Sequence, residues 1–320
     1  MRYARAAAIA TACLLAGAAT AQTYPARPVR LLVAQTPGGS ADIVARAVAQ
    51  KMSDVLGQQF VIDNRGGASG IIATETAAKA VPDGYTLLIT SSTFGVNPGL
   101  YKKLPYDPFR DIAPITLLAA APNILVVHPS LPVRTVKELI ALARAKPGYL
   151  NYGSSGNGGS PHLAAELLRL RTGIDIVHVP FKGAPAAQVA LMAGQTHMNF
   201  SSMPSAIGHV RAGKLRALAV TSVKRSQAVP ELPTMMETGI KDFETAAWQG
   251  FFAPAKTPPA IVGVLNREAA RAIQSPELKE RLSPEGAEPV ANSPEEFRVW
   301  LKHEITKWTA VIKAANIRID

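Results

Sequence analysis

Short apolar runs alternate with longer amphipathic stretches along most of the chain. Residues 29–34, 60–64 and 85–90 are apolar runs of strand length, and each precedes a segment rich in Gly, Ser or Thr. Between the first two runs, apolar residues recur at helical spacing over 43–55, with polar residues on the opposite face. This alternation of strand and helix predicts parallel sheets with helices on both faces.

The same pattern continues toward the C-terminus. Thr135 with Glu138, and Ser293 with Glu296, have the spacing of capping boxes and predict two helix starts. Residues 91–98 are expected to form a polar loop. Further strands are expected at 115–120, 124–127, 176–179, 197–201, 215–220 and 248–253, and further helices at 161–171, 203–212, 259–274 and 294–315, with others ending near 80 and 193.

The order of these elements predicts two α/β lobes. A length of 320 residues suits two domains of ordinary size. A second series of strands and helices begins after Pro122, and the strand at 248–253 is expected to cross back to the first series. We therefore expect residues 22–122 plus 247–320 to form lobe 1, and residues 123–246 to form lobe 2.

The first 21 residues have the features of an export signal. Arg2 and Arg5 precede an alanine-rich apolar run over 6–18, and residues 19–21 (Ala-Thr-Ala) form a small-residue cleavage site. The run is shorter than the roughly 20 residues that a membrane span needs. We expect cleavage after Ala21 and a soluble mature protein.

Composition excludes several classes of function. Cys13 is the sole cysteine and lies in the signal, so neither disulfides nor thiol chemistry are expected in the mature chain. The formal charge of +11 falls to +9 without Arg2 and Arg5, and the remaining basic residues are scattered, which argues against nucleic-acid binding. The six histidines lack paired metal-ligand spacing, so we expect no metal site and no cofactor.

Gly, Ser and Thr cluster where several expected strands end. The longest such segment is 151–163 (Asn-Tyr-Gly-Ser-Ser-Gly-Asn-Gly-Gly-Ser-Pro-His-Leu), in which Ser160 and Pro161 are typical of a helix N-cap and first turn. Amides at a helix start suit a small anion. One such loop is equally compatible with a simple connection. Because segments 35–42 and 91–93 share the same composition, and ligands bind at the carboxyl edge of open α/β sheets, the recurrence favours a binding site.

Enzyme motifs are incomplete in these segments. Residues 153–157 (Gly-Ser-Ser-Gly-Asn) lack the last glycine of a Gly-x-Ser-x-Gly nucleophile elbow, and no P-loop lysine follows. Asp42 is the acid near the loops, and its place in a helix first turn indicates a structural role before a ligand contact. His162 occupies a similar first turn, where a ligand contact and a structural role are equally compatible with the sequence.

Ordered motifs along the mature chain resemble the Bug or TctC-type solute-binding receptors of tripartite tricarboxylate transporters. The matching segments are 24–25 with 28–30, 37–42, 64–65 with 67–68, 82–88 (Pro-Asp-Gly-Tyr-Thr-Leu-Leu), 97–98 with 100–101, 104–108 (Leu-Pro-Tyr-Asp-Pro), 150–156 and 212–221. The resemblance implies a periplasmic-binding-protein type II fold, two α/β lobes with a ligand cleft between them. It also implies a periplasmic, non-enzymatic and monomeric receptor that closes over a small carboxylate and delivers it to membrane subunits.

The resemblance also implies that the carboxylate is held by amides, hydroxyls and water without an obligatory arginine. We expect the loop at 151–163 to hold the carboxylate and the segments 36–42 and 91–93 to face it. Gln35, Phe181, His197 and Met203 are expected to select the rest of the ligand, and the strands flanking Pro122 and Trp248 are expected to act as hinges. The candidate ligand-binding residues are Gln35, Gly39, Ser40, Ala41, Asp42, Ser91, Ser92, Thr93, Ser154, Ser155, Gly156, Gly158, Ser160, His162, Phe181, His197, Ser201 and Met203.

The chain departs from the family at positions that bear on the ligand. Ala34 and Gln35 stand where relatives often have Pro-Phe, and Gly66 stands where Pro often follows Asn-Arg. Many relatives carry an acid at the position of His197 and some at Ser201. The absence of both acids favours a dicarboxylate or aromatic acid over an amino acid. A periplasmic sensor for a signalling partner and an exported α/β enzyme are the alternative functions.

Overall fold

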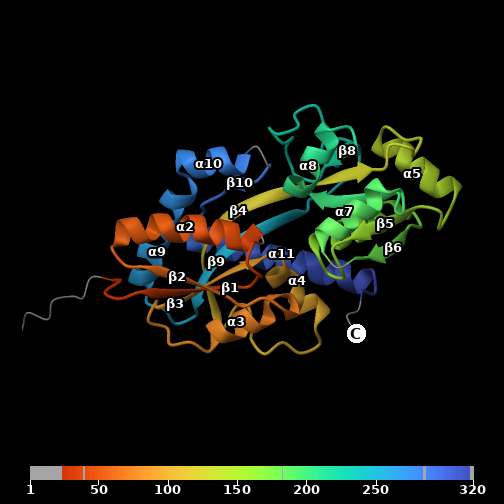
Figure 1. Ribbon diagram of the computed structural model, residues 1–320. Coiled ribbons are helices and arrows are strands. Elements are labelled where there is room, and N and C mark those ends of the chain that lie inside the picture. The colour runs from red at the N-terminus through yellow and green to blue at the C-terminus, as the bar shows by residue number, and fades with distance from the viewer. Residues whose placement is uncertain (1–23, 39, 182, 284–285, 318–320) are drawn as a thin grey trace, which may run out of the picture.

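The computed structural model describes residues 24–317 except 39, 182, 284 and 285 (Figure 1). The predicted signal and its cleavage site, and candidate residue Gly39, lie outside the described residues. Ten strands form one sheet in the order β2-β1-β3-β9-β4-β7-β5-β6, with β8 and β10 also paired to β4. The bounds are β1 Val29–Val33, β2 Phe60–Asn64, β3 Thr86–Ser91, β4 Ile112–Val127, β5 Asn151–Ser154, β6 Val177–Pro180, β7 Met198–Ser202, β8 Arg216–Val220, β9 Ala246–Pro254 and β10 Glu288–Pro289.

The sheet is mixed, which corrects the prediction of purely parallel sheets. Within each lobe three strands are parallel: β2, β1 and β3 in one, and β6, β5 and β7 in the other. The long strands β4 and β9 run antiparallel to each other and to their neighbours. This arrangement follows because the chain leaves the first lobe along β4 and returns along β9.

Strand β4 joins the two lobes. It is continuous, whereas the sequence predicts two strands separated by a break at Pro122. Residues up to Pro122 pair with β9. From Asn123 onward, β4 pairs with β7 along one edge and with β8 along the opposite edge. The proline, which lacks an N–H, is tolerated because it occupies the point where β4 changes partners. This point coincides with the predicted lobe boundary, although the movement of the lobes as units stays a prediction.

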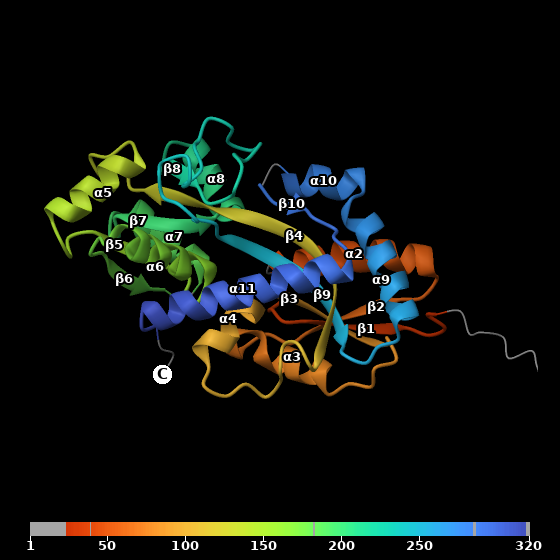
Figure 2. The same ribbon diagram turned by 180° about the vertical axis from the view of Figure 1, so that it is seen from behind.

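Helices cover both faces of each half of the sheet (Figures 1 and 2). In lobe 1 one face packs on α2, α9 and α10 and the other on α3, α4 and α11; in lobe 2 the faces pack on α5 with α6, and on α7 with α8. The bounds are α2 Ser40–Leu56, α3 Ile71–Ala78 after a short turn η1 Ala68–Gly70, α4 Thr93–Leu100, α5 Val136–Ala145, α6 Ser160–Thr172, α7 Ala184–Met192, α8 Met203–Arg211, α9 Pro259–Ile273, α10 Pro276–Leu282 and α11 Pro294–Ala314. The helices α5 and α11 begin at the two predicted capping boxes.

Two elements differ from the sequence prediction for reasons of packing. Residues 93–100 form helix α4 rather than a loop, since Phe94 and Val96 are buried and outweigh the unfavourable Pro98 inside the helix. Helix α11 spans both lobes: Leu301 and Ile305 pack in lobe 1, whereas Trp308, Val311 and Ile312 pack in the core of lobe 2 (Figure 2). The sequence predicts residues 247–320 for lobe 1 alone, and the last turns of α11 cross that division.

A neutral cleft between the lobes

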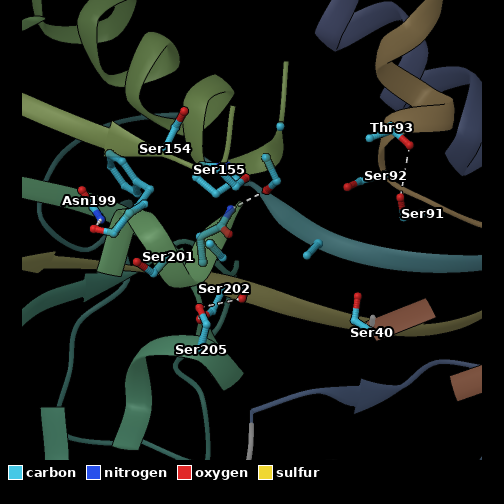
Figure 3. A pocket seen from close by; sticks show the side chains of 18 of the residues that line it. Ser40, Ser91, Ser92, Thr93, Ser154, Ser155, Asn199, Ser201, Ser202 and Ser205 are labelled. Atoms are coloured by element: carbon cyan, nitrogen blue, oxygen red, sulfur yellow. Dashed lines mark hydrogen bonds between the residues drawn. The ribbon is translucent and has the colours of Figure 1, made fainter. Parts of the chain in front are cut away.

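A cleft of about 200 Å³ lies between the lobes, where the parallel strands of each half end (Figure 3). The lobe 1 wall consists of Gln35 after β1, Ser40 at the start of α2, Ser91 at the end of β3 with Ser92 and Thr93 after it, and Ala247, Trp248 and Gln249 from β9. The lobe 2 wall consists of Gly153, Ser154, Ser155, Gly159, Ser160, Pro161, Ala184, Ala187, Gln188, Asn199, Phe200, Ser201, Ser202 and Ser205, and Asn123 from β4 completes the lining. Figure 3 shows the serines of the two walls on opposite sides of the space.

The described residues that line this cleft carry no charged side chain. They supply nine serine hydroxyls, one threonine hydroxyl and five side-chain amides. Helices α2, α4, α6, α7 and α8 all begin at the cleft, and the first turns of four of them contribute Ser40, Thr93, Ser160 and Ser205. Because the N-terminal end of a helix carries a partial positive charge and unpaired amides, the cleft favours an anion without a cationic side chain.

Nine of the predicted ligand-binding residues meet in this cleft. They are Gln35, Ser40, Ser91, Ser92, Thr93, Ser154, Ser155, Ser160 and Ser201. Their common property is that each follows or ends a strand of a parallel set, so the carboxyl edges of both halves bring them together. Direct contact of each residue with a ligand stays a prediction.

Other predicted residues support the walls without lining the cleft. The amide of Ala41 donates to Gln35 Oε1 at 2.7 Å, the amide of Gly156 donates to Ser154 Oγ at 3.1 Å, and the amide of Gly158 donates to His162 Nδ1 at 3.0 Å. The predicted amide donors at these three positions are therefore used within the protein. Met203 is fully buried beneath the lobe 2 wall, and Phe181 follows the edge strand β6 outside the lining.

His197 lies at the wrong end of its strand to contact the ligand. It precedes β7, whereas the cleft lies beyond the last residues of β7. Its Nδ1 is 2.8 Å from Asn151 Oδ1, and its ring lies 4.9 Å from that of Tyr149. His197 therefore lies away from the cleft, whereas Ser201 lines it, and the contact of Ser201 with the ligand stays a prediction.

Asp42 organises the lobe 1 loop from behind. Its carboxylate accepts hydrogen bonds from the Gly38 amide at 2.9 Å, Arg46 Nε at 3.0 Å and Asn64 Nδ2 at 2.9 Å. Burial alone would raise the pKa of the Asp42 carboxyl, but these hydrogen bonds outweigh burial and hold the pKa below its ordinary value. Asp42 has the structural role that the helix position favours, and it does not line the cleft.

Two stacked histidines support the lobe 2 loop. The rings of His162 and His178 lie 4.0 Å apart, and the ring of Tyr152 stacks on His178 at 4.8 Å. His178 Nε2 is 2.7 Å from Ser154 Oγ in the cleft wall. Burial lowers the pKa of His162 to about 4, with a smaller effect from Arg169; burial and the neighbouring His162 lower the pKa of His178 to about 4. Both rings are neutral at pH 7, so the loop rests on hydrogen bonds rather than charges.

Ser160 departs from its predicted role as the helix cap. Gly159 occupies the N-cap position of α6, and no side-chain hydrogen bond caps the helix there. The Ser160 hydroxyl instead accepts a hydrogen bond from Asn123 Nδ2 at 2.6 Å. Ser160 therefore connects the cleft wall to strand β4, a contact between residues far apart in the sequence.

Sequence reasoning missed most of the side-chain amides and the apolar part of the cleft. Asn123, Gln188, Asn199, Trp248 and Gln249 lie within strands or helices rather than in Gly-rich loops. Polar residues inside otherwise apolar strands, such as Asn123 in β4 and Asn199 in β7, were the signal that could have identified two of them. Asn199 Oδ1 accepts the Gly153 amide at 2.8 Å, and its Nδ2 donates to the Ala187 carbonyl at 3.2 Å.

The described residues contain no group of three or more His, Cys, Asp and Glu side chains that could hold a metal ion. None of the helices in the described part of the chain is long and apolar enough to cross a membrane.

Two α/β lobes around a neutral, hydroxyl-lined cleft define a solute-binding protein of the periplasmic-binding-protein type.

Comparison with known proteins identifies the family. Residues 44–317 match the model of the tripartite tricarboxylate transporter family receptor, TctC. The chain is 38% identical to protein BugT of Bordetella pertussis over 313 residues, which cover 97% of this chain and 96% of BugT. The chain belongs to the Bug/TctC family of solute-binding receptors, whose members are not enzymes.

Solved structures of relatives share the fold. The R. palustris protein Rpa4515, solved with adipate, is 39% identical with a TM-score of 0.81, covering 92% of this chain and all of that one. MatC from Rhodopseudomonas palustris, solved with malate, is 32% identical with a TM-score of 0.77, covering 90% of this chain and all of that one. Periplasmic binding protein BugD is 33% identical with a TM-score of 0.78, covering 92% of this chain and all of BugD.

Proposed function

We propose that this protein is a periplasmic receptor that captures a small carboxylate between its lobes and delivers it to the membrane subunits of a tripartite tricarboxylate-type transporter. The observation that carries the proposal is the convergence of ten hydroxyls and five helix starts on a cleft whose described lining is uncharged. The adipate and malate in the structures of two relatives support the same ligand class.

The cleft can hold a carboxylate by hydrogen bonds alone. A serine or threonine hydroxyl donates one hydrogen bond, and bonds to an ionised acceptor are roughly twice as strong as those between neutral groups. Ser91 Oγ and Thr93 Oγ1 on the lobe 1 wall lie 3.1 Å apart, so one hydroxyl orients the other. The helix starts add favourable electrostatic potential where the anion lies.

The ligand is a plain di- or tricarboxylate or an aromatic acid rather than an amino acid. A ligand ammonium would require an acceptor of negative charge, and the described lining contains none. Ser201, which is 6% exposed and lines the cleft, occupies the position where an acid would pair with an ammonium.

Closure of the lobes is the proposed mechanism of capture. Strand β4 changes partners between Pro122 and Asn123, and β9 begins at Ala246, two residues before Trp248. These segments are the hinges, and ligand contacts on both walls shift the population toward the closed state. The receptor acts as a monomer and needs no cofactor. Its signal is cleaved after Ala21, and the mature protein acts in the periplasm.

Native mass spectrometry of the protein purified from periplasm tests the ligand class. We expect a co-purified acid whose mass is lost under mild activation, and a bound cation or nucleotide would contradict the proposal. Uptake of that labelled acid into cells with tripartite membrane subunits, with and without the receptor, tests delivery. Uptake that is independent of the receptor would contradict the delivery step alone.

A further inference from the structure

The point where β4 changes partners carries a buried polar network that reaches the cleft. Asn123, Thr221 and Thr245 are each 0% exposed. The Asn123 amide donates to Thr221 Oγ1 at 2.8 Å, and the Thr221 amide donates to the Asn123 carbonyl at 2.9 Å. Thr221 Oγ1 donates to the Thr245 carbonyl at 2.5 Å, and the Thr245 amide donates to the Thr221 carbonyl at 3.2 Å. The network therefore ties together the two segments that connect the lobes.

The side chain of Asn123 extends this network to the cleft wall. Asn123 Nδ2 donates to Thr245 Oγ1 at 2.8 Å and to Ser160 Oγ at 2.6 Å. Because an amide N–H supplies the hydrogen for each bond, both hydroxyls act as acceptors there and keep their own hydrogens for other partners. Ser160 lines the cleft at the start of α6, so its hydrogen is available to a ligand in the cleft.

Asn123 also shows a feature that stability alone does not favour. Its Oδ1 is buried and has no hydrogen-bond partner among the described residues. Leaving a buried acceptor unpaired is unfavourable, and an apolar residue in this strand would avoid that cost. A buried polar group that is retained at such a cost indicates a role beyond packing.

We propose that Asn123 is a positioning residue with two roles: it orients the Ser160 hydroxyl as a donor to the ligand carboxylate, and it holds both connecting segments at the hinge through Thr221 and Thr245. This proposal rests on the carboxylate-binding function for its first half. Its second half concerns the hinge network and holds with or without a ligand.

A double-mutant cycle tests the first half. The variants are Asn123→Ala, Ser160→Ala and the pair, titrated calorimetrically with adipate or malate, whichever the wild-type protein binds. We expect each single substitution to weaken binding at least tenfold, and the pair to be no weaker than the worse single variant within twofold, because Asn123 acts through Ser160. The first half of the proposal would be overturned if the fold-loss of affinity in the double variant equalled the product of the two single losses. It would also be overturned if Asn123→Ala bound the ligand as tightly as the wild-type protein.

Thr245→Val is the matched control for folding. It removes the second acceptor of the same Asn123 Nδ2 at nearly constant volume and does not alter the cleft lining. We expect it to lower the melting temperature about as much as Asn123→Ala while affinity stays within threefold. An equal loss of affinity in both variants would reduce Asn123 to a structural role.

Hydrogen exchange of the ligand-free protein tests the second half. Asn123→Ala is expected to speed exchange of the Thr221 and Thr245 amides at least tenfold. Asn199→Ala, which removes another buried amide side chain of the cleft without touching the network, is expected to leave them unchanged. Unchanged exchange in Asn123→Ala would refute the hinge role. If the wild-type protein binds no carboxylate, the proposed function fails while this measurement still decides the hinge role.

Discussion

The two walls of the cleft present similar hydroxyls but rest on different chemistry. Behind the lobe 1 wall, Asp42 is ionised and holds the loop through Gly38, Arg46 and Asn64. Behind the lobe 2 wall, the neutral rings of His162 and His178 hold the loop through the Gly158 amide and Ser154 Oγ. In lobe 1 a charged side chain, Asp42, lies behind the residues that line the cleft. In lobe 2 the side chains that hold the loop are uncharged. The lobes should consequently respond differently to substitution and to pH.

The largest effect on ligand affinity is expected at Gly153, where the lobe 2 wall is packed too closely to accept a side chain. In Gly153→Ala the new Cβ would lie 2.7 Å from Asn199 Oδ1, which already holds the Gly153 amide and is buried. We expect carboxylate binding to become undetectable by calorimetry. Gly208→Ala in α8 is the control, since its Cβ meets no atom within 4 Å and alanine favours a helix. Wild-type affinity in Gly153→Ala would show that this wall does not contact the ligand.

A negative charge in the lobe 2 wall should weaken binding next most strongly. Ser201→Asp places a carboxylate in the cleft lining, and a like charge about 5 Å away costs about 3 kcal/mol at an effective dielectric constant of 20. We expect about a hundredfold loss of carboxylate affinity by titration. Ser201→Asn, of similar size and neutral, should lose less than tenfold. Equal losses in the two variants would show that size and not charge matters there.

Acid should destabilise the protein through lobe 2. Histidine has a pKa near 6.5 in an unfolded chain and about 4 at positions 162 and 178 here, so the unfolded state binds more protons between these values. The contribution of the two neutral histidines to the free energy of unfolding is fully present above pH 6.5. It is lost progressively as the pH drops from 6.5 to 4, and nothing further is lost from this cause below pH 4. Lowering both pKa values from 6.5 to about 4 would give about 7 kcal/mol if both groups titrated fully. Because His178 is half-buried and protonation is incomplete at pH 4.5, we expect only about 3 kcal/mol of this, seen as a melting temperature several degrees lower at pH 4.5 than at pH 7.

The double variant His162→Asn and His178→Gln should flatten this pH dependence, because asparagine can still accept from Gly158 and glutamine can still reach Ser154. His303→Asn, at an exposed position, is the control and should retain the wild-type slope. A slope unaffected by the double variant would remove the histidines from the explanation.

The smallest effect is expected behind the lobe 1 wall. Asp42→Asn removes the charge opposite Arg46 and one acceptor, and should lower the free energy of unfolding by about 1–2 kcal/mol in urea denaturation. Asp54→Asn, exposed on the same helix, should change it by less than about 0.5 kcal/mol. Because Asp42 does not line the cleft, affinity at pH 7 should stay within twofold. A tenfold loss of affinity would show that the two walls are coupled.

Sequence patterns predicted the part of the site that depends on local structure. Ser91 to Thr93 and Ser154 to Ser155 lie at or directly after the ends of strands, and parallel strands bring their carboxyl ends to one edge. Their position in the cleft could therefore be anticipated. The prediction that His197 contacts the ligand did not follow this rule, because it ignored which end of the strand His197 occupies. His197 precedes β7, on the opposite edge.

The remainder of the site depends on contacts between distant residues. Asn123 reaches Ser160 and Thr245 across 37 and 122 positions, and no local pattern encodes those hydrogen bonds. The sequence also predicts free loop amides, whereas the amides of Gly156 and Gly158 are used by neighbouring side chains. Which donors stay free for a ligand is decided by side-chain packing, which propensity and periodicity do not describe.

Calorimetric titration of the mature protein with small carboxylates and their neutral amide analogues, at low and high salt, tests the central claim most directly. We expect one saturable site for a carboxylate, at least a hundredfold weaker binding of its amide analogue, and little change in affinity with salt, because the ligand is enclosed in the cleft and no exposed cation holds it. Equal binding of the amide analogue, or affinity that falls steeply with salt, would contradict recognition of a carboxylate by a neutral cleft.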